Sequence, residues 1–165
     1  MTRITIVAIL LALPGLAAAQ QPDHIAFHGL ASFYTEDADP HLGAGVSWHK
    51  HVGRNWGLNV EYNVTTTAMT ASRQRAHSDH LLWLGVMKSF GPPDQSVPYI
   101  VIGGAGFYRH TLAPGAVDAI RFNHALGVGV GWRRWNESRR WFIAPEARLS
   151  INAHVTASVA LGFRL

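Results

Sequence analysis

The segment from Val155 to Leu165 alternates without interruption between apolar side chains and small or polar ones. Successive side chains of a β-strand point to opposite faces, so this pattern gives one apolar face and one polar face. The apolar set is Val155, Ala157, Val159, Leu161, Phe163 and Leu165. We therefore predict a β-strand here, with Arg164 on the polar face.

The beginning of the chain has the layout of a secretion signal. A short positively charged start precedes the apolar stretch Ile4–Leu13, and the small residues Ala17–Ala19 follow. The apolar stretch is shorter than the roughly 20 residues that a membrane-spanning helix needs. We predict a cleaved signal peptide over residues 1–19 and a single domain over residues 20–165.

The composition favours strands and excludes several functions. The chain has 16 glycines, six tryptophans, seven phenylalanines and four tyrosines, and 15% of its residues are charged. Glycine disfavours helices, whereas aromatic residues are enriched in strands. No cysteine is present, so a disulfide framework and a thiolate metal site are excluded. The net charge of +4 comes from scattered residues rather than a basic stripe, so we expect no nucleic-acid partner.

Seven further runs repeat the alternation and are bounded by turn residues. They cover about residues 25–34, 41–50, 56–65, 80–90, 98–108, 122–132 and 141–151. In the fourth and fifth runs apolar residues occur on both faces, so the sequence leaves open which face points inward. The pairs Arg133–Arg134 and Arg139–Arg140 are interpreted as turn residues. We expect longer connections after odd-numbered strands and short turns after even-numbered ones.

Eight amphipathic strands on a secreted chain predict a closed barrel in a membrane. Lipid cannot hydrogen-bond a polypeptide backbone, so a sheet that crosses a bilayer must close and must turn its apolar face outward. The fold prediction is an all-β, eight-stranded antiparallel up-and-down transmembrane β-barrel, closed by pairing of the last strand with the first. Aromatic residues near strand ends are expected to form membrane girdles; they are Trp48, Trp56, Tyr62, Phe122, Trp132, Trp141 and Phe163.

Three segments carry a resemblance to a known family. Residues 97–108 (Val-Pro-Tyr-Ile-Val-Ile-Gly-Gly-Ala-Gly-Phe-Tyr), 125–132 and 161–165 resemble strands of the small outer-membrane β-barrels that include the opacity proteins and the transmembrane domain of outer-membrane protein A. The resemblance covers nearly all of the mature chain. It implies a monomer in a Gram-negative outer membrane, surrounded by lipid and lipopolysaccharide and inserted by the barrel assembly machinery. The family usually ends on an aromatic residue, whereas this chain ends on Leu165.

Charged residues on the polar faces are candidates for a network inside the barrel. An eight-stranded barrel is just wide enough to be filled by its own side chains, and buried charges there must be paired. The candidates are Glu61, Glu146, Arg148 and Arg164. We expect them to plug the lumen, and a gated, porin-like narrow pore is the alternative.

Ten histidines form a second group of candidates. Five of them map near the external strand ends and could converge at one rim to bind a transition metal or sense pH; they are His41, His77, His80, His110 and His154. The alternative is that imidazoles suit the membrane interface. No His-x-x-x-His or carboxylate-completed set appears, so we predict no metal site and no other cofactor.

Enzyme activity needs a nucleophile, a base and an orienting acid within hydrogen-bond reach. The His-x-Ser arrangement of lipid A deacylase barrels is missing. Residues 77–80 (His-Ser-Asp-His) contain the right residue types, but we assign them to a loop in which neighbours point apart. We therefore predict no catalytic residues and a structural or surface-exposed barrel whose loops are available for interaction.

Two other functions stay open at this point. One is a lipid A-modifying barrel enzyme. The other is a soluble lipocalin-like barrel that binds an apolar ligand, which would follow if Leu81, Trp83 and Met87 faced inward.

Overall fold

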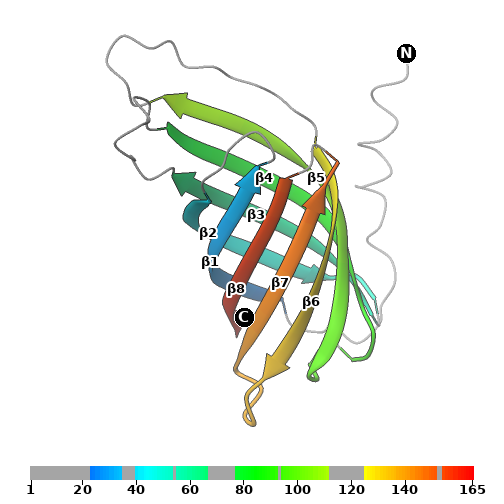
Figure 1. Ribbon diagram of the computed structural model, residues 1–165. Coiled ribbons are helices and arrows are strands. Elements are labelled where there is room, and N and C mark those ends of the chain that lie inside the picture. Colours follow the sequence, from blue (N-terminus) through cyan, green and yellow to red (C-terminus); the bar gives the residue numbers. More distant parts are fainter. Residues whose placement is uncertain are drawn as a thin grey trace, which may run out of the picture.

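The fold is a closed barrel of eight antiparallel strands with the strand order of the sequence, as predicted (Figure 1). The computed structural model describes residues 23–34, 40–53, 55–66, 77–92, 94–111, 125–151 and 154–165. The predicted signal peptide, residues 1–19, lies outside the described residues. In the part of the chain that is described, no helix is long and apolar enough to cross a membrane. The strands are β1 (His24–Tyr34), β2 (His41–His51), β3 (Trp56–Thr66), β4 (His77–Ser89), β5 (Val97–Thr111), β6 (Ala125–Trp135), β7 (Trp141–Ser150) and β8 (His154–Arg164).

The barrel closes where β8 pairs with β1. The register runs from His24 opposite Arg164 to Tyr34 opposite His154, over the full length of both strands. In Figure 1, β1 lies between β2 and β8. The predicted pairing of the last strand with the first is therefore confirmed, and the sheet has no free edge.

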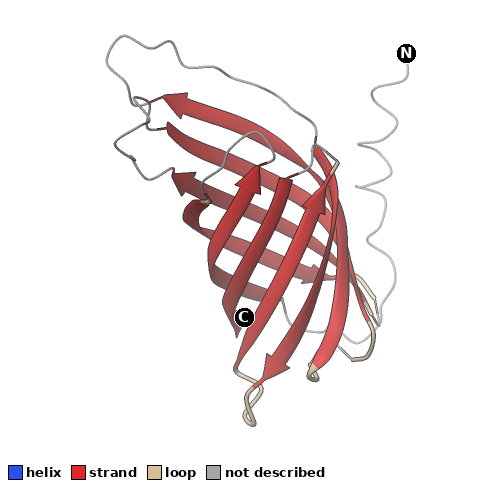
Figure 2. Cartoon of the chain, viewed as in Figure 1, coloured by secondary structure: helices blue, strands red, loops and turns tan. Residues whose placement is uncertain are grey.

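Three tight connections lie at the end of the barrel where β1 begins and β8 ends, which we call the turn end (Figure 2). They join β2 to β3, β4 to β5 and β6 to β7. The β6–β7 turn is organised by Asn136, whose side-chain oxygen accepts hydrogen bonds from the backbone N–H groups of Arg140 (2.9 Å) and Trp141 (3.2 Å). We call the opposite end the loop end. The expectation of longer connections after odd-numbered strands is wrong for β7, because residues 151–153 join it to β8 and are fewer than those of any turn-end connection.

Side chains alternate between an inward and an outward direction on every strand. On β4, Trp83 and Met87 are 1% exposed, whereas the intervening Leu84 is 56% exposed. On β5, Val101 is buried and Ile102 is 61% exposed. The two orientations that the sequence left open are thus settled, with the larger apolar residues of β4 pointing into the lumen.

Inward-facing glycines make room for these large side chains. A Cβ atom at Gly127 would meet the Trp83 ring, and one at Gly162 would collide with the Phe142 ring. Small residues opposite large ones are a general way to fill a narrow barrel. The glycine density of the sequence therefore serves the packing of the lumen.

Three strands have bounds that differ from the prediction by about three residues, and one of them, β5, continues three residues beyond its expected end. The sixth strand covers Ala125–Trp135, about three residues later than expected, and Phe122 is outside the described residues. The pair Arg133–Arg134 lies in β6 and does not form a turn, because Arg133 points into the lumen while Arg134 points outward at the turn end. The fourth strand begins at His77, so residues 77–80 belong to β4 and not to a loop.

Candidate functional site

A charged pair crosses the middle of the lumen. The Arg148 guanidinium of β7 donates two hydrogen bonds to the Glu61 carboxylate of β3, from Nη1 to Oε1 (3.2 Å) and from Nη2 to Oε2 (3.0 Å). Both side chains are at most a tenth exposed. This bidentate geometry is the strongest arrangement that an arginine makes with a carboxylate.

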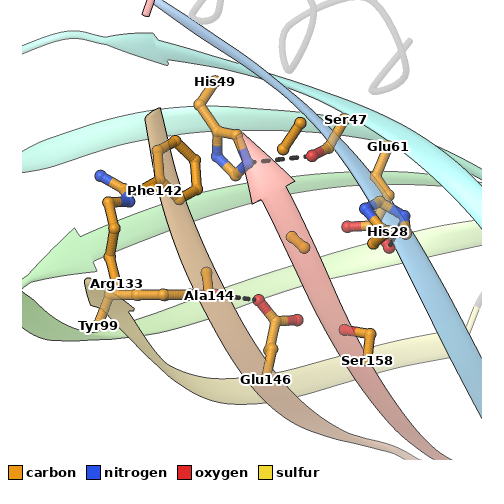
Figure 3. Close-up of a pocket in the computed structure, with 12 residues that line it drawn as sticks. His28, Ser47, His49, Glu61, Tyr99, Arg133, Phe142, Ala144, Glu146 and Ser158 are labelled. Carbon is orange, nitrogen blue, oxygen red and sulfur yellow. Dashed lines mark hydrogen bonds and ion pairs between the residues drawn. The ribbon is translucent and has the colours of Figure 1, made fainter. Parts of the chain in front are cut away.

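A second carboxylate completes the network. Arg148 Nε donates to Glu146 Oε1 (3.0 Å), and Arg148 Nη2 contacts the same oxygen. The other oxygen, Glu146 Oε2, accepts a hydrogen bond from the Tyr99 hydroxyl (2.9 Å), which Figure 3 shows as a dashed line. The guanidinium also lies over the Trp83 ring, with its Cζ 4.3 Å from the ring centroid. Arg148 of β7 therefore contacts side chains of both β3 and β4.

Amide groups satisfy the rest of the Glu61 carboxylate. Asn63 Nδ2 donates to Oε1 (2.6 Å) and Asn59 Nδ2 lies 3.4 Å from Oε2. The His28 imidazole shares a 2.6 Å hydrogen bond with Asn63 Oδ1 and lies 3.6 Å from Glu61. Such a network of partners is what makes a buried carboxylate tolerable.

Of the four residues proposed for the lumen network, the structure brings together Glu61, Glu146 and Arg148. It does not bring in Arg164, which is exposed at the turn end. The register partner of Glu146 is Ser158, and the strand between Ser158 and Arg164 is about 20 Å long. Alternation placed Arg164 on the inward side but did not set its height along the barrel.

Sequence reasoning missed a second buried arginine. Arg133 is 1% exposed, and its Cζ lies 4.9 Å from the Phe142 ring centroid and 5.5 Å from that of Tyr99. Its Nη2 also lies 3.3 Å from the Met87 sulfur. The available signal was the alternation of residues 125–132, which continues through Arg133 without a break.

Three histidines near the turn end were also missed: His24, His49 and His51. The nitrogens His51 Nε2 and His24 Nδ1 are 3.2 Å apart, and the two rings meet edge to face. His49 Nε2 shares a 3.2 Å hydrogen bond with Ser47 Oγ (Figure 3). The His24 ring packs against Trp135 at 4.9 Å between centroids. Imidazoles and aromatic rings thus fill the lumen near the turns.

Two small cavities lined by described residues lie on either side of the Arg148 layer, each with a volume of about 20 Å³. The first is bordered by His28, His49 and Glu146 (Figure 3), and the second by Ser32, Thr65 and Asp79. Such a volume holds about one water molecule. Neither of these two cavities approaches the size of a pocket for an apolar ligand, because Trp83 and Met87 fill the lumen instead of lining a hollow.

The proposed rim histidines divide between the two faces of the wall. His41 points inward, is fully buried, and has Nδ1 3.2 Å from Asp79 Oδ2. His80 lies on the outer side, where Nδ1 is 2.7 Å from the Tyr62 hydroxyl and Nε2 is 3.3 Å from Ser78 Oγ. These two histidines therefore do not converge.

The other three rim histidines, His77, His110 and His154, lie on strands, but their side chains are outside the described residues. Among the side chains that are described, no three of His, Cys, Asp or Glu type are grouped to hold a metal ion.

The outer face is apolar between two aromatic belts. Exposed side chains in the middle of the strands include Leu84, Ile102, Val130 and Val159, each more than half exposed. Aromatic side chains ring the turn end, and Tyr62 and Tyr108 lie toward the loop end. The turn-end belt consists of Trp48, Trp56, Trp132, Trp141 and Phe163. A monomeric soluble protein rarely exposes so large an apolar surface, whereas a membrane-spanning barrel requires one.

Comparisons with known proteins identify the fold. No protein-family model matches the chain, and no curated protein matches its sequence. Several solved structures match its fold. Neisserial surface protein A has a TM-score of 0.65 at 10% identity, covering 87% of this chain and 94% of that one. OprG from Pseudomonas aeruginosa has a TM-score of 0.62 at 10% identity, covering 88% and 97%.

The chain has the fold of the small eight-stranded outer-membrane β-barrels. Ail, the attachment invasion locus protein of Yersinia pestis, is another similar structure, solved with the heparin analogue sucrose octasulfate, with a TM-score of 0.58 at 13% identity and coverage of 87% and 97%. For a small outer-membrane barrel, the inward charges and the outward apolar band have one explanation. The lumen can be polar because it is sealed from lipid, whereas the outer wall must be apolar.

Proposed function

We propose that this protein is an integral outer-membrane protein without enzyme activity, whose barrel holds its loop-end connections at the cell surface for interaction. A filled lumen inside an apolar wall is the observation that carries this proposal. The Arg148 network and the Trp83 ring occupy the middle of the barrel. A barrel whose lumen is filled by side chains offers its ends as the surfaces for function.

The loop end is the better candidate surface for partners. The connections after β3 and β5, residues 67–76 and 112–124, are longer than the turn-end connections, and they lie outside the described residues. In barrels of this kind the short turns face the periplasm and the longer loops face the exterior. The similar structures include a protein named as a surface protein and one named for attachment and invasion.

The test uses the full chain expressed in a Gram-negative host. An epitope tag inserted within residues 67–76 should be labelled by antibody on intact cells, whereas a tag within residues 136–140 should be labelled only after the outer membrane is opened. The protein should fractionate with the outer membrane and show heat-modifiable gel migration. Recovery of a folded monomer from the soluble periplasm, or surface labelling of the 136–140 tag, would overturn the proposal.

Conductance measurements test the closed lumen. Purified barrel in planar bilayers should show no unitary channel openings at moderate voltage, because the Arg148–Glu61 layer leaves cavities of single-water size. A double variant, Trp83→Ala together with Arg148→Ala, removes two large side chains from the lumen. It provides a positive control for detection of a pore. Steady conductance by the unmodified barrel would favour the narrow-pore alternative.

One observation favours a second candidate, an ester hydrolase at the membrane surface. Residues 77–80 were expected to form a loop, but Ser78 and His80 lie two positions apart on β4 and share the outer face, with Oγ and Nε2 at 3.3 Å. Tyr62 holds Nδ1 of the same imidazole. In such an enzyme Ser78 Oγ would attack an ester carbonyl of a lipid, and His80 would carry its proton to the departing alcohol. Water would then hydrolyse the acyl-serine.

The missing acid weighs against this second candidate. Asp79 points inward to His41, whereas His80 lies on the outer side. The partner of His80 Nδ1 is the Tyr62 hydroxyl, whereas in catalytic triads a carboxylate orients this nitrogen. Incubation of the folded barrel with a fluorophosphonate probe, which labels activated serines, tests whether Ser78 is a nucleophile. Labelling that is lost in Ser78→Ala and weakened in Tyr62→Phe would support the hydrolase. Absence of labelling in the folded protein would eliminate it.

A further inference from the structure

The ionised side chains on the outer wall have one sign and one location. At outward positions of the described strands, the Lys, Arg, Asp and Glu residues are Lys50 on β2, Lys88 on β4 and Arg134 on β6, all near the turn end. The strand carboxylates Glu61, Asp79 and Glu146 lie on the inward side. The wall of the barrel is therefore electrically asymmetric, with a cationic band, defined as Lys50, Lys88 and Arg134, at one rim.

Two of these cations make cation–π contacts with tryptophans of the turn-end belt. Lys88 Nζ lies 4.6 Å from the Trp56 ring centroid, and these two residues are register partners on β4 and β3. Lys50 Nζ lies 5.9 Å from the Trp48 ring centroid. An ammonium group over an indole face is attracted to the ring, and both groups favour the boundary between hydrocarbon and water. The contacts hold the charges at the height of lipid headgroups.

No carboxylate neutralises the cationic band within the described part of the chain. Of the described acidic residues near the turn end, Asp94 of the β4–β5 turn is paired with Arg139 at 2.7 Å, and Asp23 and Glu137 form no ion pair with the band. Lysine side chains of this kind bury their alkyl stems against apolar surface and keep the charged end at the water boundary. The described residues therefore leave the cationic band without an ion-pair partner, and the neighbours of an outward-facing residue in a membrane are lipids.

We propose that the cationic band and the adjacent tryptophans Trp48, Trp56 and Trp132 bind the phosphate-bearing headgroups of anionic phospholipids in the leaflet at the turn end. This inference rests on the proposed function as a membrane-spanning barrel. The ammonium and guanidinium groups bind the phosphate oxygens, and the indoles pack against the acyl chains near the glycerol. Because the turn end faces the periplasm in barrels of this kind, the leaflet concerned is the phospholipid leaflet.

The experiment measures which lipids associate with the barrel. The protein is reconstituted into phosphatidylcholine vesicles that contain a minor fraction of spin-labelled phosphatidylglycerol or, in parallel, spin-labelled phosphatidylcholine. Electron spin resonance then gives the relative association constant of the two lipids with the protein surface. We expect phosphatidylglycerol to associate at least about fivefold more strongly, the factor that one lysine or arginine near an anionic surface contributes.

A matched pair of triple variants makes the test specific. Lys50→Gln/Lys88→Gln/Arg134→Gln should reduce the preference for phosphatidylglycerol to near unity. The control Arg139→Gln/Arg140→Gln/Arg164→Gln removes the same number of positive charges from the same end but leaves the outer wall intact, and it should keep the preference.

Three outcomes overturn the inference. They are an absence of preference in the unmodified protein, an equal loss of preference in the control variant, and displacement of the anionic lipid by inorganic phosphate alone. Failure of the membrane function itself is distinguishable, because the protein would then not enter vesicles or show heat-modifiable migration with either lipid.

Discussion

Arg148 on β7 meets Glu61 on β3 across the lumen through two hydrogen bonds of 3.2 and 3.0 Å, and no other cation contacts this carboxylate with comparable geometry among the described residues. Strands β3 and β7 are not neighbours in the sheet. The pair therefore braces opposite parts of the wall, and removal of Arg148 leaves two buried carboxylates, Glu61 and Glu146, without their counter-charge.

Substitution Arg148→Ala should lower the free energy of unfolding by about 3–5 kcal/mol, because Glu61 and Glu146 then remain buried without a partner cation. Urea titration in lipid vesicles, followed by tryptophan fluorescence, measures the change. The control is Arg134→Ala, which removes an outward arginine and should change stability by less than about 1 kcal/mol. Equal effects of the two substitutions would show that the lumen network contributes no specific stability.

Substitution Tyr99→Phe should cost about 1.5–3 kcal/mol, because Glu146 loses the 2.9 Å hydrogen bond from the tyrosine hydroxyl while the ring is retained. The matched control is Tyr62→Phe, which removes a hydroxyl bonded to His80 on the exposed outer side. The same urea titration applies. A smaller loss for Tyr99→Phe than for Tyr62→Phe would contradict the assigned importance of the buried carboxylate.

Substitution Gly162→Val should destabilise the barrel by about 1–3 kcal/mol through overpacking, because the new side chain would occupy the position of the Phe142 ring. At Gly29 a Cβ would meet no atom within 4 Å, so Gly29→Val is the control and should fold normally. The double variant with Phe142→Ala should be less destabilised than the sum of the single changes. Strict additivity in that cycle would refute the contact.

Substitution Val130→Arg tests the outer wall. Val130 is 57% exposed in the middle of β6, and an arginine at the bilayer midplane costs about 2–4 kcal/mol. The control is Leu165→Arg, at a 68% exposed position beyond the last strand, where the cost should be near zero. Folding into lipid vesicles measures both. A soluble barrel would tolerate both arginines equally well, which would exclude the membrane-spanning wall.

The sequence predicted the architecture well because each strand of a transmembrane barrel faces two different solvents. Val155–Leu165 shows the alternation so clearly because Val159 faces the apolar side and Ser158 faces the lumen. On β4 the pattern failed, since Trp83 fills the lumen opposite Gly127 and makes both faces apolar. The inward direction of Trp83 depends on a partner strand that local sequence does not reveal.

The candidate site was predicted less completely. Glu61 and Arg148 were found because a charge in the middle of a strand must face inward. Arg133 was missed because a double arginine also suits a turn, and its ring contacts with Tyr99 and Phe142 come from other strands. Arg164 was included because alternation gives the face of a residue but not its depth. The depth requires the register, which only the paired strands define.

Pairing of β1 with β8 also constrains how the protein can be made. The partners His24 and Arg164 are adjacent in the barrel but lie at opposite ends of its sequence. The contact that closes the barrel therefore has a very large sequence separation. A sheet of fewer strands would expose a row of unsatisfied N–H and C=O groups to hydrocarbon. Bilayer entry and completion of the cylinder must therefore be coupled in one cooperative event, and a chain truncated before β8 should stay on the aqueous side as substrate for periplasmic proteases.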